Sequence, residues 1–108
     1  MEHGCRYGSH RAIEPVGSLP QAAWKLDATS PLRDNEILVR VSRLNIDSAS
    51  FTQIRSQADG DFARIASIIR EIVAQRGKLH NPVTGSGGML IGSVERIGDS
   101  LASRIRLN

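Results

Sequence analysis

The clearest pattern of apolar and polar positions lies in residues 36–44. Apolar β-branched side chains occupy every second position there, at Ile37, Val39 and Val41. This period of two predicts a strand over 36–44. Residues 1–35 are divided by Gly and Pro into short pieces, in which 11–14 and 23–26 predict two further short strands.

A helical pattern follows. Residues 61–76 carry one apolar stripe with spacings of three and one, formed by Phe62, Ile65, Ile68, Ile69, Ile72 and Val73. The stripe predicts a helix that packs on the protein's own sheet, capped by Asp59 or Asp61 and ended by Gly77. Before it, small polar residues predict a turn and a short helix with Asp47 or Ser48 as its N-cap.

The pattern in the last third of the chain predicts turns and a strand. Residues 78–82 have the composition of a loop, and 83–98 predict a Gly-rich turn followed by a strand from Met89. An isolated glycine within a strand, here Gly92, indicates a bulge or a close approach of another backbone. The order of elements predicts a single, mainly β domain with inserted helices.

Composition narrows the class of protein. The chain has 108 residues and a net charge of +3, with arginines dispersed along its length and few aromatic residues, so no nucleic-acid partner is expected. No apolar run approaches the ~20 residues that cross a bilayer, and we expect a cytoplasmic protein with no membrane partner. Cys5 is the single cysteine, which excludes an internal disulfide framework.

Few residues point to chemistry by type alone. Three side chains that can bind a metal lie close together in the sequence, those of His3, Cys5 and His10. They lie in a segment that is expected to be flexible, where nothing fixes the geometry of a metal site. His80 precedes a Gly-rich turn and could act as a general acid or base. A polar cluster at the end of the predicted strand forms either a site or a helix cap, and consists of Asn45, Asp47, Ser48 and Ser50.

The glycine-rich stretch is a weak phosphate motif. Residues 85–88 read Gly-Ser-Gly-Gly, but Leu90 stands where a dinucleotide fingerprint needs glycine, and a strand is expected to follow instead of a helix. A phosphate-binding loop would also need a lysine nearby. A tight turn that enters a strand is therefore the favoured interpretation.

Five segments together resemble the amino-terminal part of the L-erythro-3,5-diaminohexanoate dehydrogenases. They are Gly4-Cys-Arg-Tyr-Gly-Ser-His-Arg-Ala-Ile-Glu-Pro15, Leu19-Pro-Gln21, Asn35-Glu-Ile-Leu38, Leu44-Asn-Ile-Asp-Ser-Ala-Ser-Phe51 and His80-Asn-Pro-Val-Thr-Gly-Ser-Gly-Gly-Met-Leu-Ile-Gly92. The resemblance covers nearly all of the chain and implies membership of the medium-chain dehydrogenase superfamily. It implies an incomplete GroES-like catalytic domain over 1–108, without the Rossmann domain.

The resemblance also implies a reaction. In lysine fermentation, such enzymes use NAD to oxidise and deaminate L-erythro-3,5-diaminohexanoate, a small diamino acid, to 5-amino-3-oxohexanoate and ammonia. The full-length enzyme is expected to be a homo-oligomer, and this chain alone to be inactive. Two alternatives stay open: a fragment of a zinc-free, quinone-oxidoreductase-like reductase, and a non-enzymatic GroES-like interaction module.

Site residues carry over only where the motifs match. At the ligand positions of the zinc-dependent relatives this chain has Leu44, Gly88 and Met89, so the resemblance implies no catalytic zinc. The stretch from Asn45 to Asp47 is similar to the zinc-free pattern beside the nicotinamide, which implies that Asn45 contacts the cofactor. A base must then take the proton of the amine, and His80 and Asp47 are the candidate catalytic residues.

Overall fold

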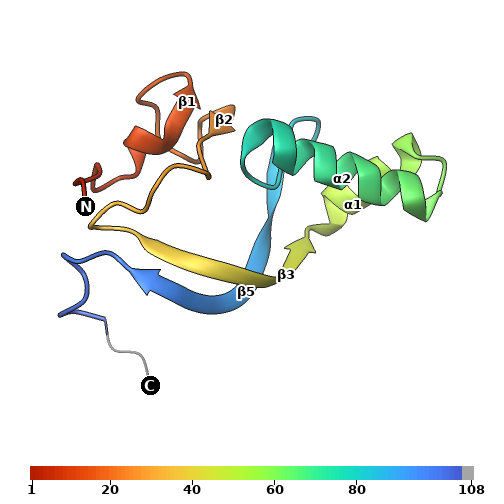
Figure 1. The fold of residues 1–108 in the computed structure, drawn as a ribbon. Coiled ribbons are helices and arrows are strands. Elements are labelled where there is room, and N and C mark those ends of the chain that lie inside the picture. Colours follow the sequence, from red (N-terminus) through yellow and green to blue (C-terminus); the bar gives the residue numbers. More distant parts are fainter. Residues whose placement is uncertain (106–108) are drawn as a thin grey trace. The chain divides into compact units, whose positions relative to one another are not determined.

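The computed structural model describes residues 1–105, and residues 106–108 lie outside the described part. The elements, in chain order, are a 3-10 helix η1 (Ser9–Arg11), β1 (Ala12–Glu14), β2 (Lys25–Leu26), β3 (Ile37–Ile46), α1 (Ser48–Gln57), α2 (Phe62–Arg76), β4 (His80–Asn81) and β5 (Ser86–Ile97) (Figure 1). Small β sheets with two α-helices agree with the predicted mainly β class. The GroES-like type stays a prediction.

The strands form two sheets, with β1 beside β2 and a second sheet in the order β3-β5-β4. The chain divides into two compact units, one formed by 1–42 with the segment after residue 90, the other by 43–90. Each of the long strands β3 and β5 contributes residues to both units. The single domain over 1–108 stays a prediction.

In the first unit, the predicted short strands are confirmed as β1 and β2. They are antiparallel, with Ala12 opposite Leu26 and Glu14 opposite Lys25. Only small side chains are fully covered here: Ala12 is 6% and Ala23 1% exposed. Apolar burial is therefore modest in this unit, and polar contacts hold much of its chain in place.

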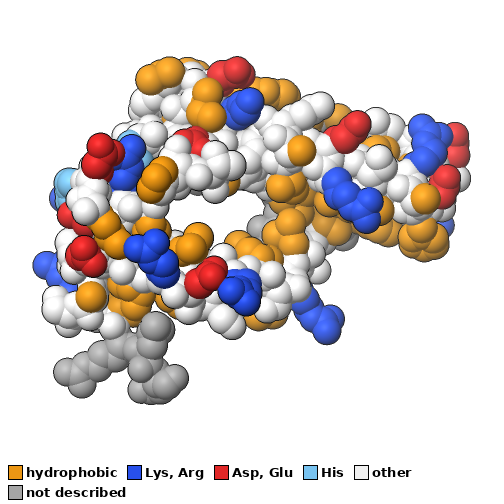
Figure 2. Space-filling model, in the orientation of Figure 1, with side chains coloured by type: hydrophobic (Ala, Val, Ile, Leu, Met, Phe, Trp, Pro, Cys, Tyr) orange, Lys and Arg blue, Asp and Glu red, His pale blue; other side chains and the backbone are white. Residues whose placement is uncertain are grey.

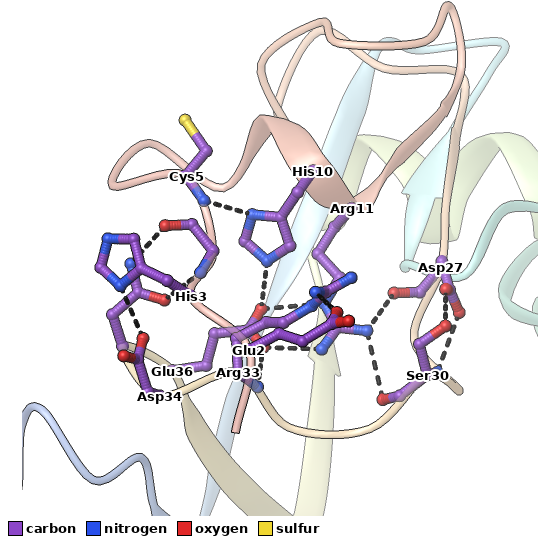
Figure 3. A network of polar contacts seen from close by, with 12 residues as sticks. Glu2, His3, Cys5, His10, Arg11, Asp27, Ser30, Arg33, Asp34 and Glu36 are labelled. Carbon is purple, nitrogen blue, oxygen red and sulfur yellow. Dashed lines mark hydrogen bonds and ion pairs between the residues drawn. The ribbon is translucent and has the colours of Figure 1, made fainter.

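Those polar contacts converge on Glu36 (Figure 3). Its carboxylate accepts hydrogen bonds from Arg11 Nε at 2.8 Å and Arg11 Nη2 at 2.6 Å, from the Arg33 main-chain N–H at 2.7 Å, and lies 2.9 Å from His10 Nε2. The hydrogen bonds from Arg11, then those from Arg33 and His10, lower the pKa of Glu36 to about 2. Arg11 also donates to the main-chain oxygens of Ser30, at 3.2 Å, and Pro31, at 2.9 Å.

The amino-terminal segment is tied to the same region, so the expectation that it is flexible is wrong. Gly4 N–H donates to Asn35 Oδ1 at 3.0 Å, and Asn35 Nδ2 donates back to Gly4 O at 2.7 Å. His3 Nδ1 lies 2.7 Å from Asp34 Oδ1. The sequence pattern could not predict this order, because each hydrogen-bond partner is 31 residues away along the chain.

In the second unit, the predicted helices and caps are confirmed. Asp47 caps α1 by accepting from Ser50 N–H, Asp61 caps α2 by accepting from Ala63 N–H, and Gly77 ends α2 with φ 70°. The core is formed by Ile54, Ala58 and Ile65, with further isoleucines and Phe51 packed around it. The stripe of α2 was predicted to pack on the sheet; it lies instead in a core shared with α1, its neighbour in Figure 1, to which β3 contributes Ile46. The helix also contacts β4.

Three local predictions need correction. Phe62 is 78% exposed and does not extend the buried stripe, since it is the first residue of α2. Part of the predicted loop 78–82 is strand β4, and β5 starts at Ser86 rather than Met89. Gly87 and Gly88 therefore lie within a strand, where their missing side chains leave room for the Leu79 and Asn45 main-chain oxygens.

Apolar side chains of β5 are poorly covered. Met89, Leu90 and Ile91 are 72%, 52% and 71% exposed. Successive side chains of a strand point to opposite faces, so neither face of β5 is covered at these positions. Figure 2 likewise shows hydrophobic side chains on the visible surface. No helix within residues 1–105 has the length and apolar character that a membrane span requires.

Candidate functional site

A cluster of hydroxyls surrounds the carboxylate of Asp47 in the second unit. Asp47 Oδ2 accepts from Ser50 N–H at 3.1 Å and from Ser86 Oγ at 3.0 Å. Ser50 Oγ lies 3.0 Å from both Thr84 Oγ1 and Ser86 Oγ, which are 2.7 Å apart. We call Asp47, Ser50, Thr84 and Ser86 the hydroxyl cluster.

Local structure positions these four residues. Asp47 and Ser50 stand at the start of α1, directly after β3, whereas Thr84 and Ser86 lie at the turn that enters β5. The hydrogen bonds from Ser50 and Ser86 lower the pKa of Asp47, so the carboxylate is ionised at neutral pH. Its other oxygen, Oδ1, is buried and has no hydrogen-bond partner within the described residues. The cluster therefore has an excess of acceptors.

The turn beside the cluster is fixed by Asn81, which is only 2% exposed. Its side chain donates to Gln53 Oε1 at 2.9 Å and accepts from Val83 N–H at 3.0 Å. In the β4–β5 pairing Asn81 lies opposite Ser86, so the same turn geometry sets the place of the hydroxyl cluster. A groove of about 180 Å³ opens next to Asn81 and is lined by side chains of α1, α2 and this turn.

His80, the other candidate base, has different partners from Asp47. Its Nδ1 lies 2.7 Å from Arg76 Nη1, which also donates to the His80 main-chain oxygen. A guanidinium only donates, so Nδ1 accepts and the ring hydrogen lies on Nε2. Partial burial, then the positive charges of Arg76 and Lys78, lower the pKa of His80. The ring is neutral here, and its role as a base stays a prediction.

Part of this site was predictable from the sequence. Asp47 and Ser50 were among the predicted polar cluster, whereas Thr84, Ser86 and Asn81 were missed. Within the Gly-rich stretch the glycines were the predicted feature, but it is the hydroxyl of Ser86 that contacts Asp47, with that of Thr84 behind it. Asn45 is exposed on β3, and its contact with a cofactor stays a prediction.

His3, Cys5 and His10 have metal-ligating side chains, but the sequence did not predict a metal site from them. His10 Nδ1 accepts from Cys5 N–H at 2.9 Å, and the Cys5 sulfur points away from the network in Figure 3. Within residues 1–105 no three His, Cys, Asp or Glu side chains gather closely enough to hold an ion. That the complete enzyme works without zinc remains a prediction.

Cys5 should instead behave as a reactive thiol. Hydrogen bonds from the Ser9 hydroxyl and from main-chain N–H groups, Tyr7 first, lower its pKa to about 7. Because the thiolate is the nucleophile, alkylation by iodoacetamide should rise with pH to a midpoint near 7, measured by mass spectrometry. Ser9→Ala should move the midpoint upward. A wild-type midpoint at the ordinary ~8.5 would contradict the prediction.

The sequence of the chain matches a known protein family. The family described as the L-erythro-3,5-diaminohexanoate dehydrogenase N-terminal domain matches residues 10–108, which is most of the chain. The chain belongs to this family. The family match includes every residue of the hydroxyl cluster.

Two curated relatives carry the name L-erythro-3,5-diaminohexanoate dehydrogenase. The protein of Fusobacterium nucleatum is 57% identical over 107 residues, which are 99% of this chain and 31% of the relative. That of Acetoanaerobium sticklandii is 58% identical over 104 residues, 96% of this chain and 30% of the relative. The chain therefore spans about three tenths of the length of these diaminohexanoate dehydrogenases.

Proposed function

We propose that this chain is the amino-terminal domain of an NAD-dependent dehydrogenase that converts L-erythro-3,5-diaminohexanoate to 5-amino-3-oxohexanoate and ammonia. The observation that carries the proposal is the 57% identity to a dehydrogenase of that name over 99% of this chain. In the reaction the 3-amine loses a proton, and the hydrogen on its carbon leaves with two electrons as hydride, which forms an imine. Water adds to the imine, and cleavage of the carbon–nitrogen bond releases ammonia.

NAD⁺ supplies the acceptor of that hydride. The described residues do not fit its pyrophosphate, because the glycine-rich stretch leads into a strand and not a helix. The space beside Gly88 is occupied by the Asn45 main-chain oxygen. We therefore assign nucleotide binding to other parts of the enzyme, and to this chain the handling of the diamino acid.

Within this proposal Asp47 faces the amine end of the reaction. Its carboxylate is ionised, has an unused buried oxygen, and reaches the surface through the hydroxyls of Ser86 and Thr84. These groups can orient an ammonium group on binding, and the proton that the 3-amine then loses goes to a base, for which His80 and Asp47 are the candidates. The lining of the nearby groove combines the polar side chains of Glu71, Gln75 and Gln57 with apolar ones that include Ile68 and Ile72. The groove thus offers polar and apolar groups to an aliphatic chain.

The first test is the reaction itself. The complete enzyme, incubated with L-erythro-3,5-diaminohexanoate and NAD⁺, should form NADH and ammonia in equal amounts. If neither appears, while a simple quinone is reduced by NADPH, the reductase alternative is correct. If no oxidoreductase activity is found with either pair of substrates, the proposal fails.

Replacing Asp47 tests the site. Asp47→Asn should lower kcat/KM for the diamino acid by about 10- to 100-fold, because it removes the charge that the cluster directs toward the amine. Asp61→Asn is the matched control, since Asp61 also caps a helix, accepting from Ala63 N–H at 3.0 Å. Equal effects of the two variants on the steady-state kinetics would show that Asp47 acts only as a helix cap.

A further inference from the structure

The hydrogens of the hydroxyl cluster have a defined direction. An ionised carboxylate only accepts hydrogen bonds, so the 3.0 Å contact between Ser86 Oγ and Asp47 Oδ2 uses the single hydroxyl hydrogen of Ser86. Ser86 can then donate to no other group. Asp47 therefore sets the orientation of the first hydroxyl.

The second hydroxyl hydrogen, that of Thr84, also has a fixed direction. Thr84 Oγ1 and Ser86 Oγ are 2.7 Å apart, and the hydrogen between them must come from Thr84, since that of Ser86 is already used. The Ser50 hydroxyl has three acceptors within reach: Thr84 Oγ1 and Ser86 Oγ at 3.0 Å and the Ser86 main-chain oxygen at 3.5 Å. All three hydroxyl hydrogens are thus directed into the cluster, and none is left for a group outside it.

Thr84 is the exposed member of the cluster, whereas Ser50 is 1% exposed and Ser86 is half-buried. Its hydrogen points inward, and one of its two lone pairs accepts from Ser86 N–H at 3.4 Å. With Ser50 donating to Ser86, the second lone pair of Thr84 is left for a ligand. A phosphate or carboxylate at this position would meet a lone pair, so the cluster disfavours anions there. A group with N–H donors is the complementary ligand.

We propose that Thr84 Oγ1 is the hydrogen-bond acceptor for an ammonium group of the diamino acid substrate, held in that role by Asp47 through Ser86. This inference rests on the proposed function. Charge favours an ammonium over a neutral amide, because Asp47 is hydrogen-bonded here by neutral groups, the Ser50 N–H and the Ser86 hydroxyl. The partial positive end of α1 offsets only part of the carboxylate's charge.

The test compares two replacements of Thr84 in the complete enzyme. Thr84→Val keeps the shape and removes the oxygen, and should raise KM for 3,5-diaminohexanoate about tenfold, with a smaller change in kcat and none in KM for NAD⁺. Thr84→Ser should retain the wild-type KM. Thr52→Val makes the same chemical change at an exposed position of α1, and should leave all constants unchanged.

Other outcomes overturn the inference. An unchanged KM for the diamino acid in Thr84→Val, with active wild-type enzyme, refutes the role of Thr84 but not the proposed function. A rise confined to KM for NAD⁺ would show that the N–H donor belongs to the cofactor's carboxamide. Ser86→Ala is the second variant: it frees the Thr84 hydrogen to turn outward, so it should raise the same KM, and no rise would refute the directed cluster.

Discussion

Replacing Glu36 with glutamine is expected to lower the free energy of unfolding by about 3 kcal/mol. Glu36 is the common acceptor for His10, Arg11 and Arg33. Its pKa falls from 4.5 to about 2 through these contacts, and each pKa unit corresponds to about 1.4 kcal/mol. The variant also leaves the Arg11 guanidinium, only 16% exposed in its side chain, without its carboxylate. Urea denaturation of the chain measures the loss.

The same pairing predicts a pH dependence. The folded-state pKa of Glu36 is depressed, so its contribution is complete above the unfolded value of 4.5 and is lost as pH falls toward about 2. Wild-type stability should therefore decline through this range more steeply than that of Glu36→Gln. Parallel curves of unfolding free energy against pH would contradict the linkage.

A second ion pair in the same unit is the control for both experiments. Arg40 and Glu95 are 2.9 Å apart, but their side chains are 74% and 42% exposed. Exposed pairs contribute less than about 1 kcal/mol, so Glu95→Gln should have little effect. If it costs as much as Glu36→Gln, the loss reflects net charge and not the Glu36 contacts.

Gly92→Ala should destabilise the chain by about 3 kcal/mol, the upper part of the range for overpacking. A methyl group at Gly92 would collide with the Arg40 main-chain oxygen and lie 2.8 Å from Val39 Cγ1. Relief requires the strands β3 and β5 to separate, because the obstacle is backbone and cannot rotate away. Thermal unfolding followed by circular dichroism measures the effect.

Gly17→Ala separates this collision from the general cost of replacing a glycine. Gly17 has φ +78°, and nothing lies within 4 Å of an added methyl group. Its replacement should cost only the ~1 kcal/mol of a left-handed conformation. Equal losses for the two variants would show that the close approach at Gly92 is relieved without cost.

The sequence predicted those elements whose cause is local. The alternation around Val39 gave β3, and Asp47, Asp61 and Gly77 marked helix ends because a cap acts on neighbouring residues. Gly92 was predicted to mark a bulge or a close approach, and the structure shows a close approach.

What the sequence could not predict depends on partners far along the chain. Glycines suggested a turn at 83–88, but two of them serve backbone contacts with Leu79 and Asn45 inside a sheet. The amino-terminal segment is likewise held in place by hydrogen bonds to side chains near Glu36, far along the chain. For the site, Asp47 could be proposed from its place after a strand, whereas Thr84 and Ser86 required the sheet that brings them to it.

The contacts of the amino-terminal segment also imply an order of events during synthesis. His3 and Gly4 are held by residues 31 positions later, and Arg11 by Glu36, 25 positions later. During synthesis, residues 3–11 leave the ribosome before these partners and stay without them until the region around Glu36 has emerged. Closing such loops costs entropy before the contacts repay it. Nascent chains that end before Glu36 should therefore expose residues 3–11 to proteases, and longer ones should progressively protect these residues.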